Sequence, residues 1–573
     1  MTLSMHPFSP ERRVGTVYEV EGSRVGVTFD DASRLPRSLY GEYAGRGEVG
    51  EFLLVDVGGV GAFGRVVRIG TPVANSDHLG NPAYDQRIPV QGQLELLSTL
   101  RLDGTSFRGI AKYPRVGDPV FAASGQSIAT VLDALPQEAA AMPIGRLAVD
   151  ESITINVPLS RLFGRHLAIV GATGSGKSWT LGHIAENVAS LRGKMIIIDA
   201  TGEFRTLNGA RHLSFATEAG EPKGTTVVGI PHFLMRESDR NAFLLPSAGA
   251  QLPKLREAVR SLKLAHAIQT SSNAPASHKA WVDADGLIAK ANRNISEFQR
   301  LLEAYGSDVE KPAAPFDITL LSAQIQNECI WPSGKVGNQT NAEFGGINQN
   351  DVGYVSSLIS RVNDLLQTPE VMNVIDPQTA GASNVVSEIT TWLEDDSSPL
   401  LRISQRNLTF EYTLREIVVN ILGQILLAKA RAGQFLEKPL IVAVDEAHQF
   451  FDVTVGAEHA TSHLHAFDSI AKEGRKHGLT TCIVTQRPSD LPAGLFSQVG
   501  MTIVHRLADG RDLRRIEAAA AEIDRSATRL IPGLVPGEAV LMGVDFPVPA
   551  SVHVQRPAHP PASDGPNYAL WNR

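Results

Sequence analysis

One glycine-rich stretch has the residue types and the spacing that are needed to hold a phosphate group. Residues 171–178 read Gly-Ala-Thr-Gly-Ser-Gly-Lys-Ser and match the pattern G-x-x-x-x-G-K-[ST]. Glycines let the backbone wrap closely around an anion, with main-chain N–H groups and a helix N-terminus facing it. The apolar run 167–170 predicts a buried strand before the stretch, and the apolar residues after it recur at helical spacing. This context favours a phosphate-binding loop over an ordinary glycine-rich turn.

The side chains of this stretch predict a nucleotide site that includes a metal ion. Lys177 is expected to reach the β- and γ-phosphates, and the Ser178 hydroxyl is expected to help hold Mg²⁺. The residues expected to line the nucleotide are Gly171, Ala172, Thr173, Gly174, Ser175, Gly176, Lys177, Ser178 and Trp179.

A second motif supplies acidic groups. The apolar run 440–444 predicts a buried strand, and it ends in Asp445 and Glu446. Asp445 suits the shell of Mg²⁺, and Glu446 suits the base that orients the attacking water. Paired acids at a strand end can be incidental, but beside a phosphate-binding loop the catalytic interpretation is favoured. His448 either couples hydrolysis to movement or packs against the sheet.

Two further polar residues flank the next predicted strand, residues 480–485. Gln486 follows it, where a neutral amide can sense the γ-phosphate by hydrogen bonding. Arg475 precedes it and is our first candidate for an arginine that stabilises the transition state in a neighbouring subunit; Arg487 and Arg506 are the alternatives. A cation that complements a helix dipole is the competing interpretation of Arg475.

The strand predicted over residues 194–199 also ends in an acid, and the chain continues as Ala-Thr-Gly-Glu-Phe. Ligands collect at the carboxyl ends of strands in open α/β sheets, which would place Asp199 and Glu203 near the nucleotide. A helix cap at Asp199 with a solvent-facing Glu203 is equally favoured.

Composition limits the class of protein. The chain has 573 residues, 43% of them hydrophobic and 20% charged, so it can build several globular units. We expect no membrane span and no secretion signal. Two cysteines far apart in sequence support neither a disulfide framework nor a zinc cluster, which suits a cytoplasmic protein. The net charge of −8 gives no general attraction to nucleic acid, although a local basic channel would suffice.

Changes in composition and residue pattern along the sequence predict five regions. Short β-rich runs with glycine turns predict a small barrel or sandwich, and strands that alternate with helices predict a mainly parallel α/β sheet. Four prolines near the C-terminus predict an extended tail, which is either disordered or laid across a neighbouring subunit. The regions are 1–145 (assembly or docking domain), 146–230 (first part of the core), 231–345 (helical insertion), 346–555 (second part of the core) and 556–573 (tail).

Several motifs in this order resemble the HerA family of hexameric DNA-translocating ATPases, which is related to FtsK. They are HLAIVGATGSGKSWT, DATGEF, IVAVDEAH, EGRKHG and TQRPSDLP, and QLPKLREA and GEAVLMGVDFPVPASVHV extend the resemblance over most of the chain. The form DATGEF departs from the expected DPHGEY, which leaves the role of Glu203 open. The resemblance implies a RecA-like P-loop ATPase core with an N-terminal β-barrel domain and a helical insertion.

The resemblance also implies partners. ATP and Mg²⁺ would lie between the subunits of a homo-hexamer, with double-stranded DNA through the ring and Arg475 reaching across the interface. A NurA-like nuclease in end resection, or a sirtuin-type or other effector in anti-phage defence, would dock on the N-terminal barrel.

Rival classes fit less well. The string Asp-Glu-Ala-His invites comparison with DEAH-box helicases, but those place the acidic motif soon after the P-loop, whereas here residue 445 is distant from residue 177. A conjugation-coupling ATPase shares the core but carries a membrane anchor. An ATP-controlled ring scaffold that licenses an effector without processive translocation remains the alternative function.

Overall fold

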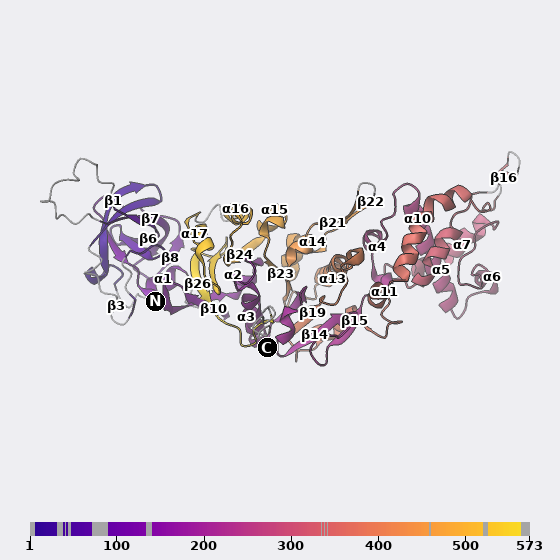
Figure 1. Cartoon of the computed structure of the whole chain (residues 1–573), viewed down its shortest axis with the longest axis horizontal. Helices are drawn as coiled ribbons and strands as arrows, with labels where there is room; N and C mark the ends of the chain where they lie inside the picture. Colours follow the sequence, from indigo (N-terminus) through magenta and orange to yellow (C-terminus); the bar gives the residue numbers. More distant parts are fainter. Residues whose placement is uncertain are drawn as a thin grey trace, which may run out of the picture.

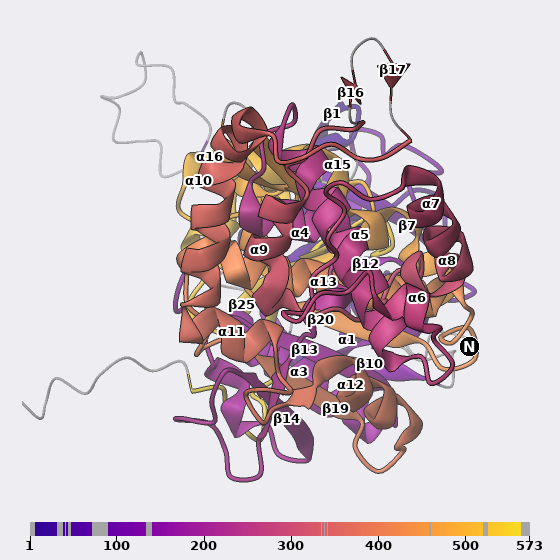
Figure 2. The ribbon, with the colours of Figure 1, turned by 90° about the vertical axis from the view of Figure 1, so that its right-hand side faces the viewer.

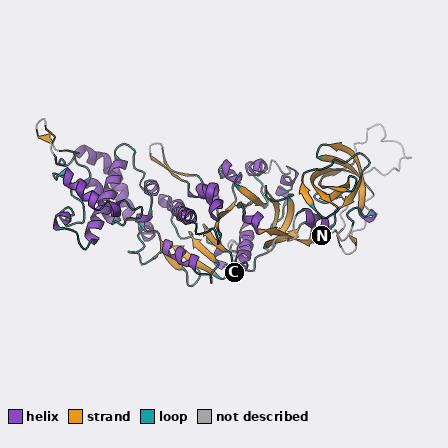
Figure 3. Ribbon diagram, turned by 180° about the vertical axis from the view of Figure 1, so that it is seen from behind, coloured by secondary structure: helices purple, strands orange, loops and turns teal. Residues whose placement is uncertain are grey.

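The protein is elongated, with a β-rich end, a central α/β unit and a helical end (Figures 1 and 3). The structure, a computed structural model, describes residues 6–30, 38–39, 42–43, 47–71, 90–132, 140–333, 335–336, 339–340, 342–457, 460–519 and 525–562. Among these residues no helix is both long enough and apolar enough to cross a membrane. Both cysteines, Cys329 and Cys482, are buried as free thiols.

The β-rich end is a closed barrel with an order of β2-β1-β9-β5-β6-β7. A pairing between β2 and β7 closes the barrel, and β8 extends the sheet beyond β7. Alternate residues of these strands point inward, as Val25 and Val27 do on β2, and form the barrel core. The strands are β1 (Arg13–Glu21), β2 (Arg24–Phe29), β5 (Phe52–Asp56), β6 (Val60–Gly70), β7 (Gln91–Arg101), β8 (Ser106–Arg108) and β9 (Pro119–Ala122). The sequence left barrel and sandwich open, and β7 and β8 were not predicted.

The central unit is a 13-stranded sheet. Its order is β11-β10-β26-β25-β24-β12-β23-β20-β13-β19-β14-β15-β18. All pairs from β24 to β18 are parallel, whereas β25, β26, β10 and β11 are joined antiparallel. The strands are β10 (Ala141–Leu147), β11 (Asp150–Pro158), β12 (His166–Val170), β13 (Lys194–Asp199), β14 (Ala210–Phe215), β15 (Thr226–Gly229), β18 (Ser383–Asn384), β19 (Leu400–Ser404), β20 (Leu440–Val444), β23 (Leu479–Thr485), β24 (Val499–Val504), β25 (Glu538–Met542) and β26 (Ala550–Val554).

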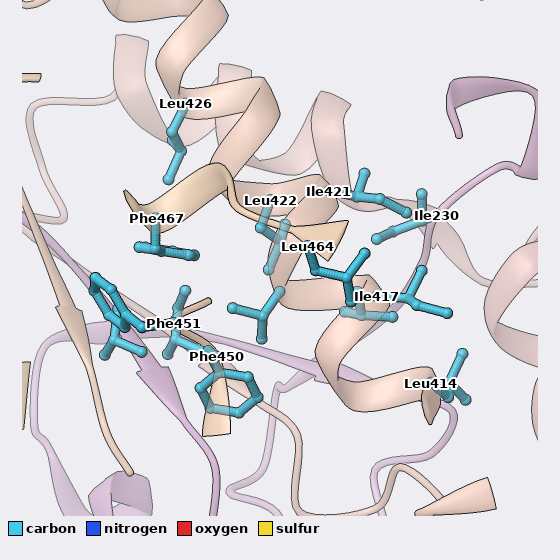
Figure 4. Packing of buried hydrophobic residues seen from close by; sticks show 14 of the residues in the cluster. Ile230, Leu414, Ile417, Ile421, Leu422, Leu426, Phe450, Phe451, Leu464 and Phe467 are labelled. Atoms are coloured by element: carbon cyan, nitrogen blue, oxygen red, sulfur yellow. The ribbon is translucent and has the colours of Figure 1, made fainter. Parts of the chain in front are cut away.

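Helices cover both faces of this sheet, which is why its central strands are apolar throughout. On β13, Ile196 and Ile198 belong to one hydrophobic cluster, whereas Met195 and Ile197 belong to the other. Helix α3 (Lys177–Ser190) packs on the second face. Helices α13 (Leu414–Arg431) and α14 (Ala466–Glu473) pack on the first, where the labelled leucine, isoleucine and phenylalanine side chains meet (Figure 4).

The helical end contains the region that the sequence predicts as an insertion (Figures 1 and 2). Helix α10 packs on α9 and α5, so the helical layer continues past residue 345. Residues 282–305 carry helical periodicity, which favours a helix, but the first half is not helical, because Val282 and Ile288 form a bridge around a turn that Asp283 caps. The helices of this end are α5 (Gln251–Thr270), α6 (Ala276–Lys279), α7 (Ile295–Ala304), α8 (Gly306–Val309), α9 (Leu321–Asn327) and α10 (Gln349–Leu366). The helices α4 (Glu237–Leu244), α11 (Pro369–Ile375) and α12 (Val385–Glu394) contact the central unit.

The smaller elements connect these units. Residues 334–351 are polar and rich in Gly and Asn, which favours a loop, and their described part includes the short strands β16 and β17 before α10 begins at Gln349. The remaining elements are β3 (Ser38–Leu39), β4 (Glu42–Tyr43), α1 (Gly125–Val131), α2 (Leu159–Phe163), β16 (Lys335–Val336), β17 (Gln339–Thr340), β21 (Val453–Ala457), β22 (Ala460–Leu464), α15 (Ala493–Phe496), α16 (Gly510–Ala519) and α17 (Arg525–Thr528).

One ion-pair network lies wholly inside the sheet. Arg402 on β19 donates from Nε to Asp199 and from Nη1 to Glu221, each at 2.6 Å, and these side chains are fully buried. Asp199 also accepts from the N–H groups of Gly202, Glu203 and Phe204, at 2.8–3.2 Å. The network therefore fixes the turn that follows β13.

Removing the central cation should destabilise the α/β unit. Arg402→Ala would leave two buried carboxylates without their partner, so we expect a loss of about 3–5 kcal/mol in the free energy of unfolding. Chemical denaturation of the full chain, followed by circular dichroism, measures it. Arg256→Ala is the matched control, because its pair with Glu237 is about half exposed and should contribute less than about 1 kcal/mol. Equal losses in the two variants would contradict this account.

Candidate nucleotide-binding site

The glycine-rich stretch forms a tight loop between β12 and α3. Gly174 and Gly176 have φ values of +72° and +117°, in a region that side chains disfavour. The Ala172 carbonyl accepts from Ser175 Oγ at 2.7 Å and from Lys177 Nζ at 3.1 Å. Lys177 begins α3, so its ammonium and the first N–H groups of the helix converge on the concave side of the loop.

A buried histidine packs against the glycine-rich loop. His505 is fully buried, and burial lowers its pKa to about 4, so its ring is neutral near neutral pH. Its Nδ1 lies 2.8 Å from the Glu538 carbonyl and therefore donates, which leaves Nε2 to accept from Thr180 Oγ1 at 2.8 Å. A Cβ at Gly171 would lie 2.6 Å from His505 Cβ, so the close approach requires glycine there.

The acidic pair lies at the carboxyl end of β20, two strands from the loop. Burial is the main cause that raises the pKa of Asp445 well above its usual value, and the charges of Asp199, Glu446 and Glu203 add to it. Burial likewise raises the pKa of Glu446, which Lys177 opposes. Glu446 adopts φ +48°, and its Oε2 is buried without a hydrogen-bond partner among the described residues. A buried carboxylate oxygen that makes no hydrogen bond among the described residues, with a buried ammonium acting on it, fits a site that receives a polar ligand.

Lys177 faces these acids. It is 8% exposed, and burial lowers its pKa, whereas the charges of Glu446, Asp445 and Glu203 raise it. A buried ammonium among carboxyl groups attracts an anion only when that anion is accompanied by further positive charge, as a phosphate with Mg²⁺ is.

Two neighbouring strand ends complete this edge of the sheet. Gln486 follows β23, and its Oε1 accepts from Thr173 Oγ1 of the loop at 2.6 Å. His448 Nδ1 lies 3.1 Å from Thr485 Oγ1 and 3.3 Å from Glu446 Oε2. Burial is the main cause that lowers the pKa of His448, which favours a neutral ring near neutral pH.

The two interpretations of the strand end at 199 are now distinguished. Asp199 caps the following turn and pairs with Arg402, so it has the structural role. Glu203 is partly exposed, yet its charge acts on Lys177, Asp445 and Glu446. Glu203 therefore lies close enough to these three groups to affect their pKa values.

Of the three candidate arginines, Arg487 and Arg506 follow β23 and β24 at the edge of the P-loop, and Arg475 lies at the opposite edge of the sheet. Arg487 follows β23 and acts on Glu446 of its own chain, and the Arg506 carbonyl accepts from the Ala172 N–H at 2.8 Å. Arg475 precedes β23, is exposed, and acts electrostatically on His166, where β12 begins. The seven residues of β23 put about 20 Å between this arginine and the loop. Arg475 therefore cannot reach the site of its own chain.

The fold and this site define a P-loop ATPase of the RecA-like α/β class. A family model described as "Helicase HerA, central domain" matches residues 142–361. "DNA double-strand break repair helicase HerA" of Sulfolobus acidocaldarius is 22% identical over 525 residues, which cover 88% of each chain. The protein of the same description from Pyrococcus furiosus is 23% identical, over 72% of this chain and 69% of its own. The chain is therefore similar to the HerA helicases over most of its length.

Other similar proteins extend the comparison. "Probable helicase MJ1565" of Methanocaldococcus jannaschii is 22% identical over 82% of this chain and 76% of its own. Among solved structures, the bacterial conjugative coupling protein TrwB has a TM-score of 0.43 and 15% identity over 76% of this chain and 92% of its own.

Sequence reasoning missed the residues that act from a distance. His505 and Arg402 are not part of a local sequence motif. The role of each follows from hydrogen bonds to residues that are far away in the sequence. The one available signal was a polar residue at the end of, or inside, an apolar strand segment.

The site predicts a separation of binding from turnover. We expect Glu446→Gln to bind ATP but to lose at least about 100-fold in turnover, because the amide cannot accept a proton from water. Lys177→Ala should lose both, because the phosphate charge is no longer balanced. Isothermal titration with a non-hydrolysable ATP analogue and a phosphate-release assay distinguish the two. Undiminished turnover in Glu446→Gln would remove that residue from the role.

Proposed function

We propose that this protein is an ATP-hydrolysing DNA translocase or helicase that acts as a homo-hexameric ring. The observation that carries the proposal is the meeting of Lys177, Asp445, Glu446 and Gln486 at one edge of a parallel sheet. A loop for phosphates, an acid pair and an amide sensor are the groups that nucleoside triphosphate hydrolysis requires. The names of the HerA relatives support DNA as the substrate on which the motor acts.

The proposed mechanism assigns one task to each group. Ser178 and Asp445 would hold Mg²⁺, which neutralises the developing charge on the phosphates. Lys177 and the loop N–H groups bind the β- and γ-phosphates. Glu446 Oε2, which is buried and makes no hydrogen bond among the described residues, accepts the proton of the attacking water. Gln486, held by Thr173, detects the γ-phosphate and communicates its loss to the loop.

The position of Arg475 supports assembly into a ring. An exposed arginine on the edge opposite to its own nucleotide site can act only on another chain. In a ring with ATP at each interface, every Arg475 would face the site of the next subunit, which stabilises the transition state only when neighbours are in place.

The barrel supports a docking role for a partner. Tyr113 and Val116 are 56% and 68% exposed on this domain. Exposure of large apolar side chains to water does not stabilise an isolated chain, and it is typical of surfaces that bind a partner. We propose that a nuclease of the NurA type, or a sirtuin-type or other defence effector, binds there. The setting would be DNA end processing or anti-phage defence, in the cytoplasm.

The ATPase rate of the purified protein with and without duplex DNA, measured beside its mass, tests the motor. We expect a hexamer whose turnover rises several-fold, about five- to tenfold, with DNA, because translocation couples hydrolysis to the track. A hexamer that is indifferent to DNA would contradict the motor and would favour the ring scaffold that licenses an effector. A monomer with full activity would contradict both.

Mixing variants tests the arginine. We expect Arg475→Ala alone to lose turnover of about 1,000-fold while the ring persists. In mixed rings with Glu446→Gln subunits, an interface with an intact Arg475 and an intact Glu446 forms again, so partial activity should return. Mass photometry confirms the mixing. Mixed rings with no recovered turnover would place Arg475 outside the interface site.

A further inference from the structure

The segment 556–562, here called the strap, leaves β26 and lies on the P-loop helix of its own chain. Glu186 on α3 accepts from the N–H groups of Ala558 at 2.8 Å and His559 at 2.7 Å. The His559 ring lies 3.1 Å from the same carboxylate. The sequence left disorder and contact with a neighbouring subunit open for the tail. Residues 556–562 pack on their own chain, and residues 563–573 lie outside the described residues.

The strap packs on the first turns of the same helix. The Arg556 guanidinium lies 4.5 Å from the centre of the Trp179 ring, at cation–π distance. The rings of Pro557 and Pro561 lie over Gly182, where a Cβ would be in ordinary contact with both. Trp179 is two residues from Lys177, so the strap contacts the end of α3 that carries the phosphate-binding side chains.

The far end of the strap is anchored on a different element. Thr206 Oγ1 donates to the Pro560 carbonyl at 2.7 Å, and the Ala562 N–H donates to the Glu203 carbonyl at 2.8 Å. The N–H of Glu203 is bonded on the other side to Asp199. The turn that carries Glu203 is therefore held between the Arg402 network and the strap.

These two anchors connect two parts of the nucleotide site whose charges interact. The strap joins α3, which begins at Lys177, to the turn of Glu203, whose charge acts on Lys177, Asp445 and Glu446. The strap thus contacts both the helix that begins at Lys177 and the main chain of Glu203.

We propose that the strap positions the nucleotide site within its own chain and that Glu186 is the positioning residue through which it does so. The inference rests on the proposed nucleotide site and adds a linkage to it. If a docked strap strengthens nucleotide binding by some factor, bound nucleotide must stabilise strap docking by the same factor. Ordinary surface packing of a tail has no such coupling.

The test compares Glu186→Ala with Glu297→Ala in the full-length protein. Glu297 is an exposed glutamate on α7, and its side chain has no hydrogen bond or ion pair among the described residues, so the charge change is matched. We expect Glu186→Ala to bind a non-hydrolysable ATP analogue about tenfold more weakly than wild type, and Glu297→Ala to bind as wild type.

Hydrogen exchange supplies a second readout that packing alone would not move. Because residues 557, 560 and 561 are prolines, the informative strap amides are those of Ala558, His559 and Ala562. In wild type they should exchange about tenfold more slowly with the analogue than without it. In Glu186→Ala the protection and its dependence on the analogue should both be lost. Glu186→Gln, which keeps one acceptor oxygen, should be intermediate and serves if the alanine variant does not fold.

Two results would overturn the inference: analogue binding in Glu186→Ala equal to that in Glu297→Ala, or strap exchange in wild type that is the same with and without the analogue. Lys177→Ala separates this failure from failure of the proposed function. If wild type and Lys177→Ala bind the analogue alike, the nucleotide site itself is wrong. If only Lys177→Ala loses binding and the strap is indifferent, the site stands and the strap is packing.

Discussion

Negative charge buried at one edge of a parallel sheet is the constraint on which the rest of the structure depends. Two strand ends and one turn bring Asp199, Asp445, Glu446 and Glu203 together, and carboxylates without counter-charge are costly in such surroundings. The negative charge of each acid is compensated in a different way. Asp199 is neutralised by Arg402 and three amides, whereas Asp445 makes no ion pair among the described residues and has a raised pKa. Lys177 remains as the charge that the other acids share.

The topology explains how one loop can be held from so many directions. The P-loop strand β12 lies between β23 and β24, so loops from both neighbours contact the glycine-rich turn. The antiparallel strands β25 and β26 then bring the C-terminal part of the chain back over it. The N–H of Gly537, just before β25, donates to the Ser175 carbonyl, and His505, just after β24, lies against Gly171. The rigidity that phosphate binding needs thus comes from segments remote in sequence.

The sequence was informative where the chemistry is local. The P-loop, the strand that ends in Asp445 and Glu446, and the position of Arg475 before β23 each depend on a short window in which spacing and residue type carry the signal. What could not be predicted depends on pairing across the fold. No local pattern links Arg402 to Glu221, Thr180 to His505, or Glu186 to residues 558 and 559. Residues 282–294 are not helical for another reason: the hydrogen bonds of the Asp283 side chain to the turn outweighed the helical periodicity of the sequence.

The closure of the N-terminal barrel restricts how anything can recognise it. Strands β1, β2, β5, β6, β7 and β9 each pair on both sides, so they leave no long edge with unpaired N–H and C=O groups. A protein that added a strand here would have to break an existing ladder, apart from a short contact along the three residues of β8. Recognition therefore depends on side chains and turns, which change readily by substitution, and not on the backbone, which is common to all sequences. Related chains can keep the same barrel while diverging in what binds to it.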